Sequence, residues 1–246
     1  MNTRTLLLLL IVVAGCVSTG AVDNSKMAEG YYTKGIAYLQ DKNYEGAYVE
    51  FNRSIQTDST YKNAYYGLGI ISDYQGKLDS AQKYYEKAID LDDKFSEAHN
   101  ALGVVFSKQR KWKDAIKAFE KALANKLYTT PHIAYLNMGD VYLAQKDYAK
   151  AIEQYRESKR FANLEFTILK LGAALLEAGK TRDAIAELQE GASLAPQSAN
   201  MRYNLALALL KDGDKKHAVI EFKKAADLAP KTDIAQKAND YIKTLR

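Results

Sequence analysis

Residues 103–115 read GVVFSKQRKWKDA, a run that opens on a glycine and closes on an alanine twelve residues later. The same pattern, a Gly or Ala followed twelve residues later by Ala, occurs at Gly35/Ala47, Gly69/Ala81, Gly103/Ala115, Gly139/Ala151, Gly172/Ala184 and Ala206/Ala218. The intervals between successive pairs are 34, 34, 36, 33 and 34 residues. A period of this length indicates stacked copies of one structural unit, because each copy buries its apolar face only against its neighbours.

Two further columns keep the same period. A bulky residue lies four positions after each alanine: Phe51, Tyr85, Phe119, Tyr155, Leu188 and Phe222. A small residue lies seven positions after it: Ser54, Ala88, Ala122, Ser158, Gly191 and Ala225. Small residues let two helices approach closely while the bulky side chain fills the space between units. With only three prolines in the chain, this pattern predicts an all-α protein.

The period and its columns resemble the tetratricopeptide repeat, a helix-turn-helix unit. The resemblance covers about residues 28–230 and implies a superhelical array of six repeats. Beyond the last repeat, apolar residues recur at helical spacing among polar ones, which predicts a C-terminal capping helix over the apolar end of the array. These residues are Ile234, Ala238, Tyr241, Ile242 and Leu245. We therefore expect residues 28–246 to form one repeat domain.

The N-terminus has the features of a secretory signal. Arg4 precedes the uncharged run 6–13, which is too short to span a bilayer and suits the apolar region of a signal peptide. The residues 13–16, VAGC, resemble the lipobox of bacterial lipoproteins. That resemblance implies cleavage before Cys16 and lipidation of Cys16; the alternative is a plain signal peptide with a chance cysteine.

Two N-terminal segments and a localisation follow from this interpretation. We expect a signal peptide over residues 1–15 and a short lipidated tether over residues 16–27, rich in small and polar residues. In similar lipoproteins an aspartate after the cysteine signals inner-membrane retention, and this chain has Val17 there. The resemblance therefore implies an outer-membrane protein, lipid-anchored and facing the periplasm.

The sequence offers no catalytic constellation. Its three histidines fall in different repeats, and the single cysteine excludes a multi-cysteine metal site within one chain. Gly67 and Gly69 begin like a dinucleotide motif but lack the third glycine, and no Walker-type sequence occurs. The net charge of +5 is spread among alternating acidic and basic residues, which does not favour nucleic acid. We expect no enzyme, no cofactor, no metal, no nucleic acid and no small-molecule substrate.

The concave face of the array is the expected binding surface for a protein partner. In each unit the first helix lines this concave face. We call the residue that opens the repeated pattern, Gly or Ala, the Gly column. The lining positions are three residues before, one after and four after it. The predicted groove residues, all in the first three units, are Tyr32, Ile36, Leu39, Tyr66, Ile70, Asp73, Asn100 and Val104, with Ser107 completing the third set. Tyr32 and Tyr66 lie outside the core columns, so we expect them to be exposed apolar anchors. Alternatively, the chain's own linker or a neighbouring protomer fills the groove.

Two other features bear on this surface. Trp112 shares a column with Tyr44, Leu78 and Tyr148 at the start of the second helix, which favours a place in the core. Repeat domains that clamp a C-terminal carboxylate carry Lys and Asn across successive units. No such pattern is evident here, which argues against that kind of clamp.

The irregular interval of 36 residues narrows the set of tetratricopeptide-repeat proteins that the chain resembles. The linker 124–131 reads ANKLYTTP and carries two extra residues before the segment 134–139, AYLNMG. This resembles the tetratricopeptide lipoproteins of type IV pilus biogenesis, the pilotins, which have an extended Leu-Tyr-x-x-Pro linker followed by Asn-x-Gly. The resemblance implies that the protein binds the pilus secretin and assists its localisation or multimerisation. Alternatives are an adaptor for cell-envelope enzymes such as peptidoglycan hydrolases, and a regulator of an enzyme complex.

Overall fold

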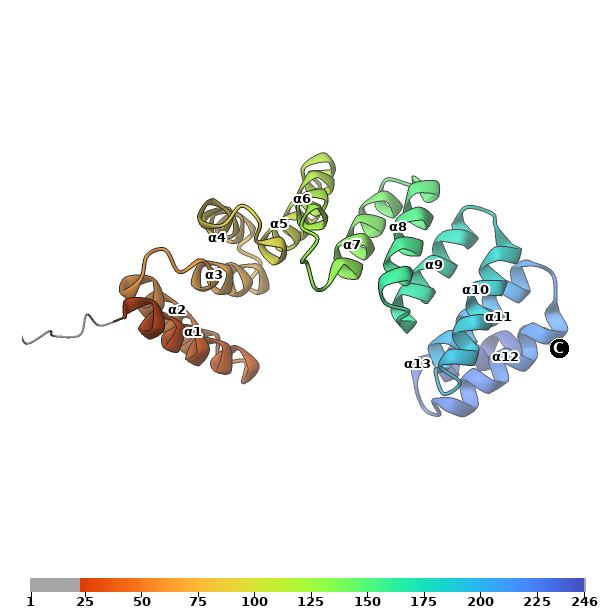
Figure 1. Ribbon diagram of the computed structural model, residues 1–246. Coiled ribbons are helices and arrows are strands. Elements are labelled where there is room, and N and C mark those ends of the chain that lie inside the picture. The colour runs from red at the N-terminus through yellow and green to blue at the C-terminus, as the bar shows by residue number, and fades with distance from the viewer. Residues whose placement is uncertain (1–22, 246) are drawn as a thin grey trace, which may run out of the picture.

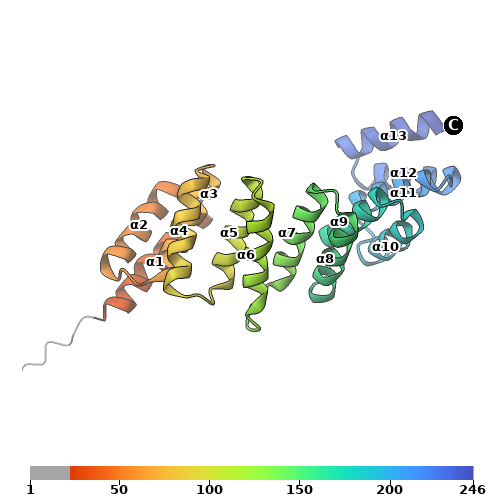
Figure 2. The same ribbon diagram turned by 90° about the horizontal axis from the view of Figure 1, so that it is seen from above.

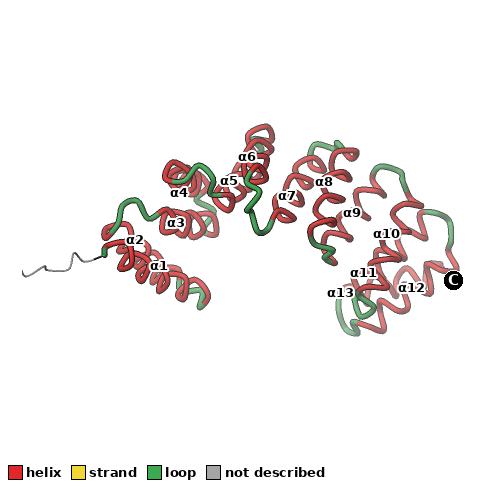
Figure 3. The backbone as a smooth tube through the Cα atoms, viewed as in Figure 1, coloured by secondary structure: helices red, strands yellow, loops and turns green. Residues whose placement is uncertain are grey.

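A computed structural model describes residues 23–245 of the 246-residue chain. This part folds into thirteen α-helices and contains no β-strand (Figure 3). The helices are α1 (Asn24–Gln40), α2 (Tyr44–Thr57), α3 (Lys62–Tyr74), α4 (Leu78–Leu91), α5 (Ser96–Lys108), α6 (Trp112–Ala124), α7 (Pro131–Ala144), α8 (Tyr148–Phe161), α9 (Glu165–Glu177), α10 (Thr181–Leu194), α11 (Ala199–Lys211), α12 (Lys215–Leu228) and α13 (Asp233–Leu245).

The first twelve helices form six antiparallel pairs that stack side by side into an arc (Figure 1). The first helix of each pair lies on the inner side of the arc. Viewed from the outer side, α4 and α6 lie in front and α3 and α5 lie behind them (Figure 2). The predicted all-α superhelical array of six repeats is therefore confirmed.

The core of each pair is made by the columns recognised in the sequence. The six alanines of the repeated pattern are completely buried, and so are Phe51, Phe119 and Phe222. A Cβ atom built on Gly103 would lie 2.5 Å from the ring of Phe119, and one on Gly35 would lie 2.4 Å from the ring of Phe51. The glycines are required because the ring of the second helix lies directly against the backbone of the first.

Every turn within a pair contains one residue in the left-handed region, seven positions after the Gly column. The residues are Lys42 (φ 58°), Gly76 (72°), Arg110 (59°), Lys146 (61°), Gly179 (74°) and Gly213 (89°). Glycine adopts this conformation without steric cost, whereas a residue with a Cβ is strained there. Three of the six turns therefore hold a residue that the backbone does not favour.

α13 covers the last pair, as the sequence predicted. Three residues of α13 are buried against the last pair: Ala235, Ala238 and Ile242. The ring of Tyr241 stacks on Phe222 with centroids 4.7 Å apart. The outer face of α13 carries charged residues, so this helix ends the apolar stack with a polar surface.

The first helix begins earlier than the sequence indicated. Asp23 is the N-cap of α1, and its side chain accepts a hydrogen bond of 3.3 Å from the Lys26 backbone N–H. Residues 24–27 of the predicted tether are therefore helical, because Asp23 caps the helix ahead of the buried Ala28. The predicted signal peptide, Cys16 and the tether up to residue 22 lie outside the described residues. Within residues 23–245, no helix has the length and apolar character needed to cross a membrane.

Candidate functional site

Tyr32 and Tyr66 lie on the inner side of the arc but are only partly exposed. The ring of Tyr66 lies 5.7 Å from Tyr85 and 5.2 Å from Phe95, measured between centroids. Tyr32 lies 5.6 Å from both Phe51 and Tyr61. The expectation that the two tyrosines are exposed anchors is wrong, because the residue that precedes each following inner helix packs against them.

The environment of Tyr66 shows the extent of this burial. Desolvation raises the pKa of Tyr66 to about 12, with a smaller contribution from the nearby Glu97 carboxylate. Its phenol therefore stays neutral and sits between neighbouring units.

The other predicted groove residues of the first two units are also shared between core and groove. Ile36 and Leu39 pack against the cluster around Phe51 and Leu68, and Ile70 packs against the cluster around Tyr85. Eight of the nine corresponding positions of the last three units are apolar too, the exception being Asp140: Leu136, Leu143, Leu169, Ala173, Leu176, Tyr203, Leu207 and Leu210. The apolar inner surface therefore continues beyond the third unit.

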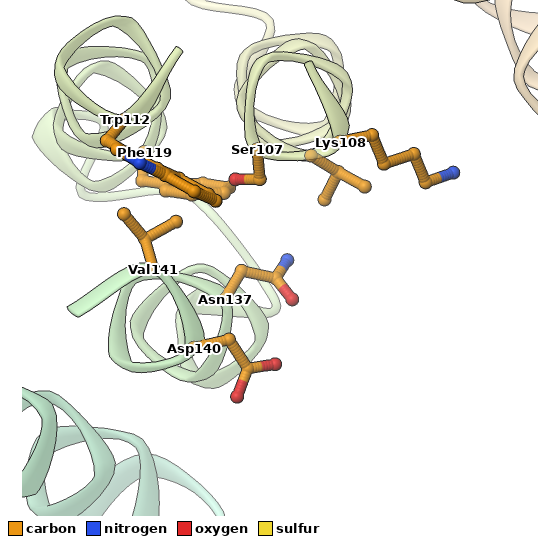
Figure 4. A pocket seen from close by; sticks show the side chains of 8 residues that line it. Ser107, Lys108, Trp112, Phe119, Asn137, Asp140 and Val141 are labelled. Carbon is orange, nitrogen blue, oxygen red and sulfur yellow. The ribbon is translucent and has the colours of Figure 1, made fainter. Parts of the chain in front are cut away.

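A hole opens on the inner side between α5, α6 and α7 (Figure 4). Its volume is about 160 Å³, and it is lined by Val104, Ser107, Lys108, Trp112, Phe119, Asn137, Asp140 and Val141. Trp112, Phe119 and Val141 form one end of the hole, and the polar side chains gather at the other (Figure 4). We name this feature the α5–α7 hole. Trp112 packs with the core as expected, but it also lines this hole.

Short side chains in the third unit create the α5–α7 hole. Val104 and Ser107 stand where the first unit has Ile36 and Leu39. Ser107 also turns back to its own helix, because its hydroxyl donates a hydrogen bond of 2.9 Å to the carbonyl of Gly103. The space that a leucine side chain would occupy is consequently left open.

The charges at the polar end are paired within the protein. The Lys108 ammonium lies 2.6 and 2.7 Å from the two carboxylate oxygens of Asp73. The Lys170 ammonium lies 2.7 and 3.0 Å from those of Asp140, which also accepts a 2.7 Å hydrogen bond from Tyr155. Burial, and then the bond to Asp140, raise the pKa of Tyr155 well above its usual range. The mouth of the hole therefore has polar character without an uncompensated charge.

Two amides lie beside the hole. The Asn137 side-chain amide donates a hydrogen bond of 3.1 Å to the side-chain oxygen of Asn100. Each amide group has both donor and acceptor capacity. The pair therefore retains an N–H group on Asn100 and an oxygen on Asn137 that bond to nothing else within residues 23–245.

Sequence reasoning found part of this arrangement. It named Asp73, Asn100 and Val104, but it missed Asn137 and Asp140, although Asp140 occupies the same column as Val104 one unit later. Lys108 and Asn137 both line the hole, but they come from different columns and do not repeat across successive units. The absence of a carboxylate clamp stays a prediction, and the pairing of Lys108 with Asp73 also disfavours such a clamp.

The histidines make local contacts. His99 Nε2 lies 2.9 Å from the carbonyl oxygen of Asp93, and His217 Nδ1 lies 2.7 Å from Asp214. In the part of the chain that the structure describes, no group of three or more His, Cys, Asp or Glu side chains is placed to hold a metal ion.

The repeat class is established by sequence comparison as well as by the fold. Three profiles of the tetratricopeptide repeat match residues 63–95, 96–163 and 169–232. The chain therefore belongs to the tetratricopeptide-repeat family, whose fold is typically a non-catalytic scaffold for protein interactions.

Among solved structures, the array is similar to PilF of Pseudomonas aeruginosa, with 21% identity and a TM-score of 0.74 over 88% of this chain and 98% of that one. It is also similar to PilW, described as a widely conserved type IV pilus biogenesis factor, with 20% identity and a TM-score of 0.75 over 87% and 99%. At these identities the likeness shows a shared fold. A human intraflagellar transport protein 88 homologue is 33% identical over 89 residues, 34% of this chain, which spans only 11% of that protein.

Proposed function

We propose that the protein is an outer-membrane lipoprotein that binds the type IV pilus secretin and assists its localisation or multimerisation. The observation that supports this most is the end-to-end match with two pilus biogenesis proteins, of which 98% and 99% are covered. An array of the same extent presents an inner surface of the same length. The extended linker with LYTTP at 127–131 adds to the case.

The lipid anchor would hold this surface close to the membrane. Asp23, the cap of α1, follows Cys16 by seven positions in the sequence. A chain of that length spans at most about 25 Å when fully extended. Several acyl chains on one residue, at about 0.8 kcal/mol per buried methylene, give a stable attachment. The partner would therefore be captured at the membrane surface where a channel protein must assemble.

Replacement of Cys16 tests this proposal. In cells that carry Cys16→Ala, we expect the protein to be unprocessed or released from the membrane, and the yield of heat-resistant secretin multimers in the outer membrane to fall severalfold. Mass spectrometry of the wild-type mature chain should show acylated Cys16. An unmodified membrane-bound chain, or a normal multimer yield, would contradict the proposal. Co-purification of peptidoglycan hydrolases in place of the secretin would favour the adaptor function.

A further inference from the structure

At the α5–α7 hole, the protein's own side chains leave a side-chain-sized space on the inner surface. We propose that this hole receives one uncharged apolar side chain, of the size of leucine or phenylalanine, from an extended segment of the partner. We further propose that Asn100 and Asn137 bond the backbone of that segment. This inference deepens the proposed function, and it rests on that function for the existence of a protein partner.

The volume of the α5–α7 hole sets the size of its occupant. Apolar cavities of about 150 Å³ accept a molecule of the size of benzene. At about 160 Å³, this hole accommodates a leucine or a phenylalanine ring. The ring systems of Trp112 and Phe119 and the methyl groups of Val104 and Val141 offer apolar contacts to such a group. A methyl side chain would leave most of the space unfilled.

The paired charges decide the polarity of the occupant. Lys108 is held by Asp73, and Asp140 is held by Lys170 and Tyr155. A charged side chain or a free C-terminal carboxylate entering the hole would lose its hydration and find each counter-ion already engaged. An uncharged side chain loses no such hydration, so the anchor is apolar and the segment does not end at it.

The amide pair decides the conformation of the segment. Asn100 offers an N–H group and Asn137 offers an oxygen, which match one carbonyl and one N–H of a peptide backbone. An α-helix has these backbone groups bonded internally, whereas an extended chain presents them outward. The site therefore fits an extended segment whose backbone crosses the inner face beside the hole.

Trp112 provides a direct readout, because it is the only tryptophan of the chain and it lines the hole. The mature full-length protein in detergent would be titrated with an uncharged nine-residue peptide, acetylated and amidated, with one leucine between Gly and Ser residues. We expect a saturable change in Trp112 emission. The same peptide with alanine in place of leucine should bind at least tenfold more weakly.

Ser107→Leu is the decisive variant, because leucine occupies the equivalent position in four other inner helices: Leu39, Leu143, Leu176 and Leu210. The added side chain should fill the hole, keep or raise the Tm, and weaken peptide binding at least tenfold. Ala173→Leu adds the same bulk to the inner face of α9, away from the hole, and should leave binding unchanged. Asn100→Ala should weaken binding about threefold to tenfold through the lost backbone bond.

Three results would overturn the inference: unchanged peptide binding by Ser107→Leu, equal binding of the leucine and alanine peptides, or tighter binding of a peptide whose leucine carries a free terminal carboxylate. The peptide assay contains no secretin, so its outcome is separate from that of the proposed function. Peptide binding as expected, with normal secretin assembly in cells carrying Ser107→Leu, would retain the hole as a peptide site and remove the secretin as its partner. Loss of secretin multimers in Cys16→Ala cells, with no effect of Ser107→Leu on peptide binding, would retain the function and remove the hole.

Discussion

Gly103 and Phe119 define the packing of one repeat at the scale of single atoms. The ring of Phe119 is completely buried, and its edge lies directly against the backbone of Gly103. The sequence predicted this contact because small and bulky residues recur at matched positions, and both partners belong to the same unit. It did not predict the burial of Tyr66, because Phe95 comes from the turn before the next unit and its position depends on how the units stack.

Gly103→Ala should destabilise the protein by about 1–3 kcal/mol, since the new methyl group would lie 2.5 Å from the Phe119 ring. Gly30 is the matched control, because a Cβ there meets no atom within 4 Å. Gly30→Ala should stabilise α1 by about 0.5–1 kcal/mol through the better helix propensity of alanine. Thermal and urea unfolding would measure both. Equal effects of the two substitutions would contradict the close contact.

At the scale of secondary-structure elements, the turns within the pairs fall into two classes. Gly76, Gly179 and Gly213 take the left-handed conformation without strain, whereas Lys42, Arg110 and Lys146 take it at a cost. The sequence period places these six residues in one column, but composition alone does not reveal that the column has a positive φ. Half of its members are lysine or arginine, which gives no signal of a left-handed turn.

Arg110→Gly should therefore raise the stability of the third unit by about 0.5–1 kcal/mol, a relief of strain partly offset by the freer unfolded chain. We expect the Tm to rise by roughly 1–4 °C. Gly179→Ala, the converse change in the fifth unit, should lower it by a similar amount. Calorimetry would measure the Tm of both variants. A fall in Tm for Arg110→Gly would show that contacts of the arginine side chain stabilise the fold by more than its left-handed backbone destabilises it.

Asp92 makes the stability of a turn between units depend on pH. Its carboxylate bonds the Lys62 ammonium and the Lys94 backbone N–H, and these contacts, the first above all, hold its pKa below the ordinary value. A lowered pKa in the folded state gives stability that is complete above the unfolded value, about 3.9, and is lost as the pH falls through the folded value.

Asp92→Asn should consequently lower the Tm at pH 7, and the difference from the wild type should shrink on going to pH 2, because the wild-type carboxyl takes up its proton as the pH falls. Asp93→Asn serves as the control, since the Asp93 carboxylate makes no hydrogen bond within residues 23–245, and it should be neutral at both values. Melting curves followed by circular dichroism at the two pH values test this. An equal loss at pH 2 would show that the carboxylate charge is not the cause.

At the scale of the whole molecule, α13 caps the C-terminal end of the array. α13 covers Phe222, Ala225 and Ala226, which are buried together with it. The sequence predicted the number of units, their order and this cap because each follows from periodicity. The α5–α7 hole was not predictable in the same way, since it combines short side chains of α5 with the position that α7 takes after the longer linker.

Truncation after Pro230 removes α13 and should expose the apolar face of α12. We expect a lower Tm and concentration-dependent association, because a stack without its polar cap presents a surface suited to another copy. Light scattering coupled to gel filtration would measure the association. Lys237→Glu combined with Lys243→Glu changes charge on α13 without removing it and should remain as monomeric as the wild type; association by that variant would point to charge instead of the cap.

The ion pairs on the inner face also have a mechanical consequence. Lys108 with Asp73 and Lys170 with Asp140 each join the inner helices of neighbouring units, α5 to α3 and α9 to α7. Any motion that straightens the arc moves the inner helices apart and separates these pairs. The two ion pairs therefore oppose straightening of the arc. Salt weakens exposed ion pairs progressively, because the Debye length falls from about 8 Å at physiological ionic strength to about 3 Å at 1 M. The bending stiffness of the arc, and the ease with which it spreads around a bulky assembly, should therefore follow the ionic strength of its surroundings.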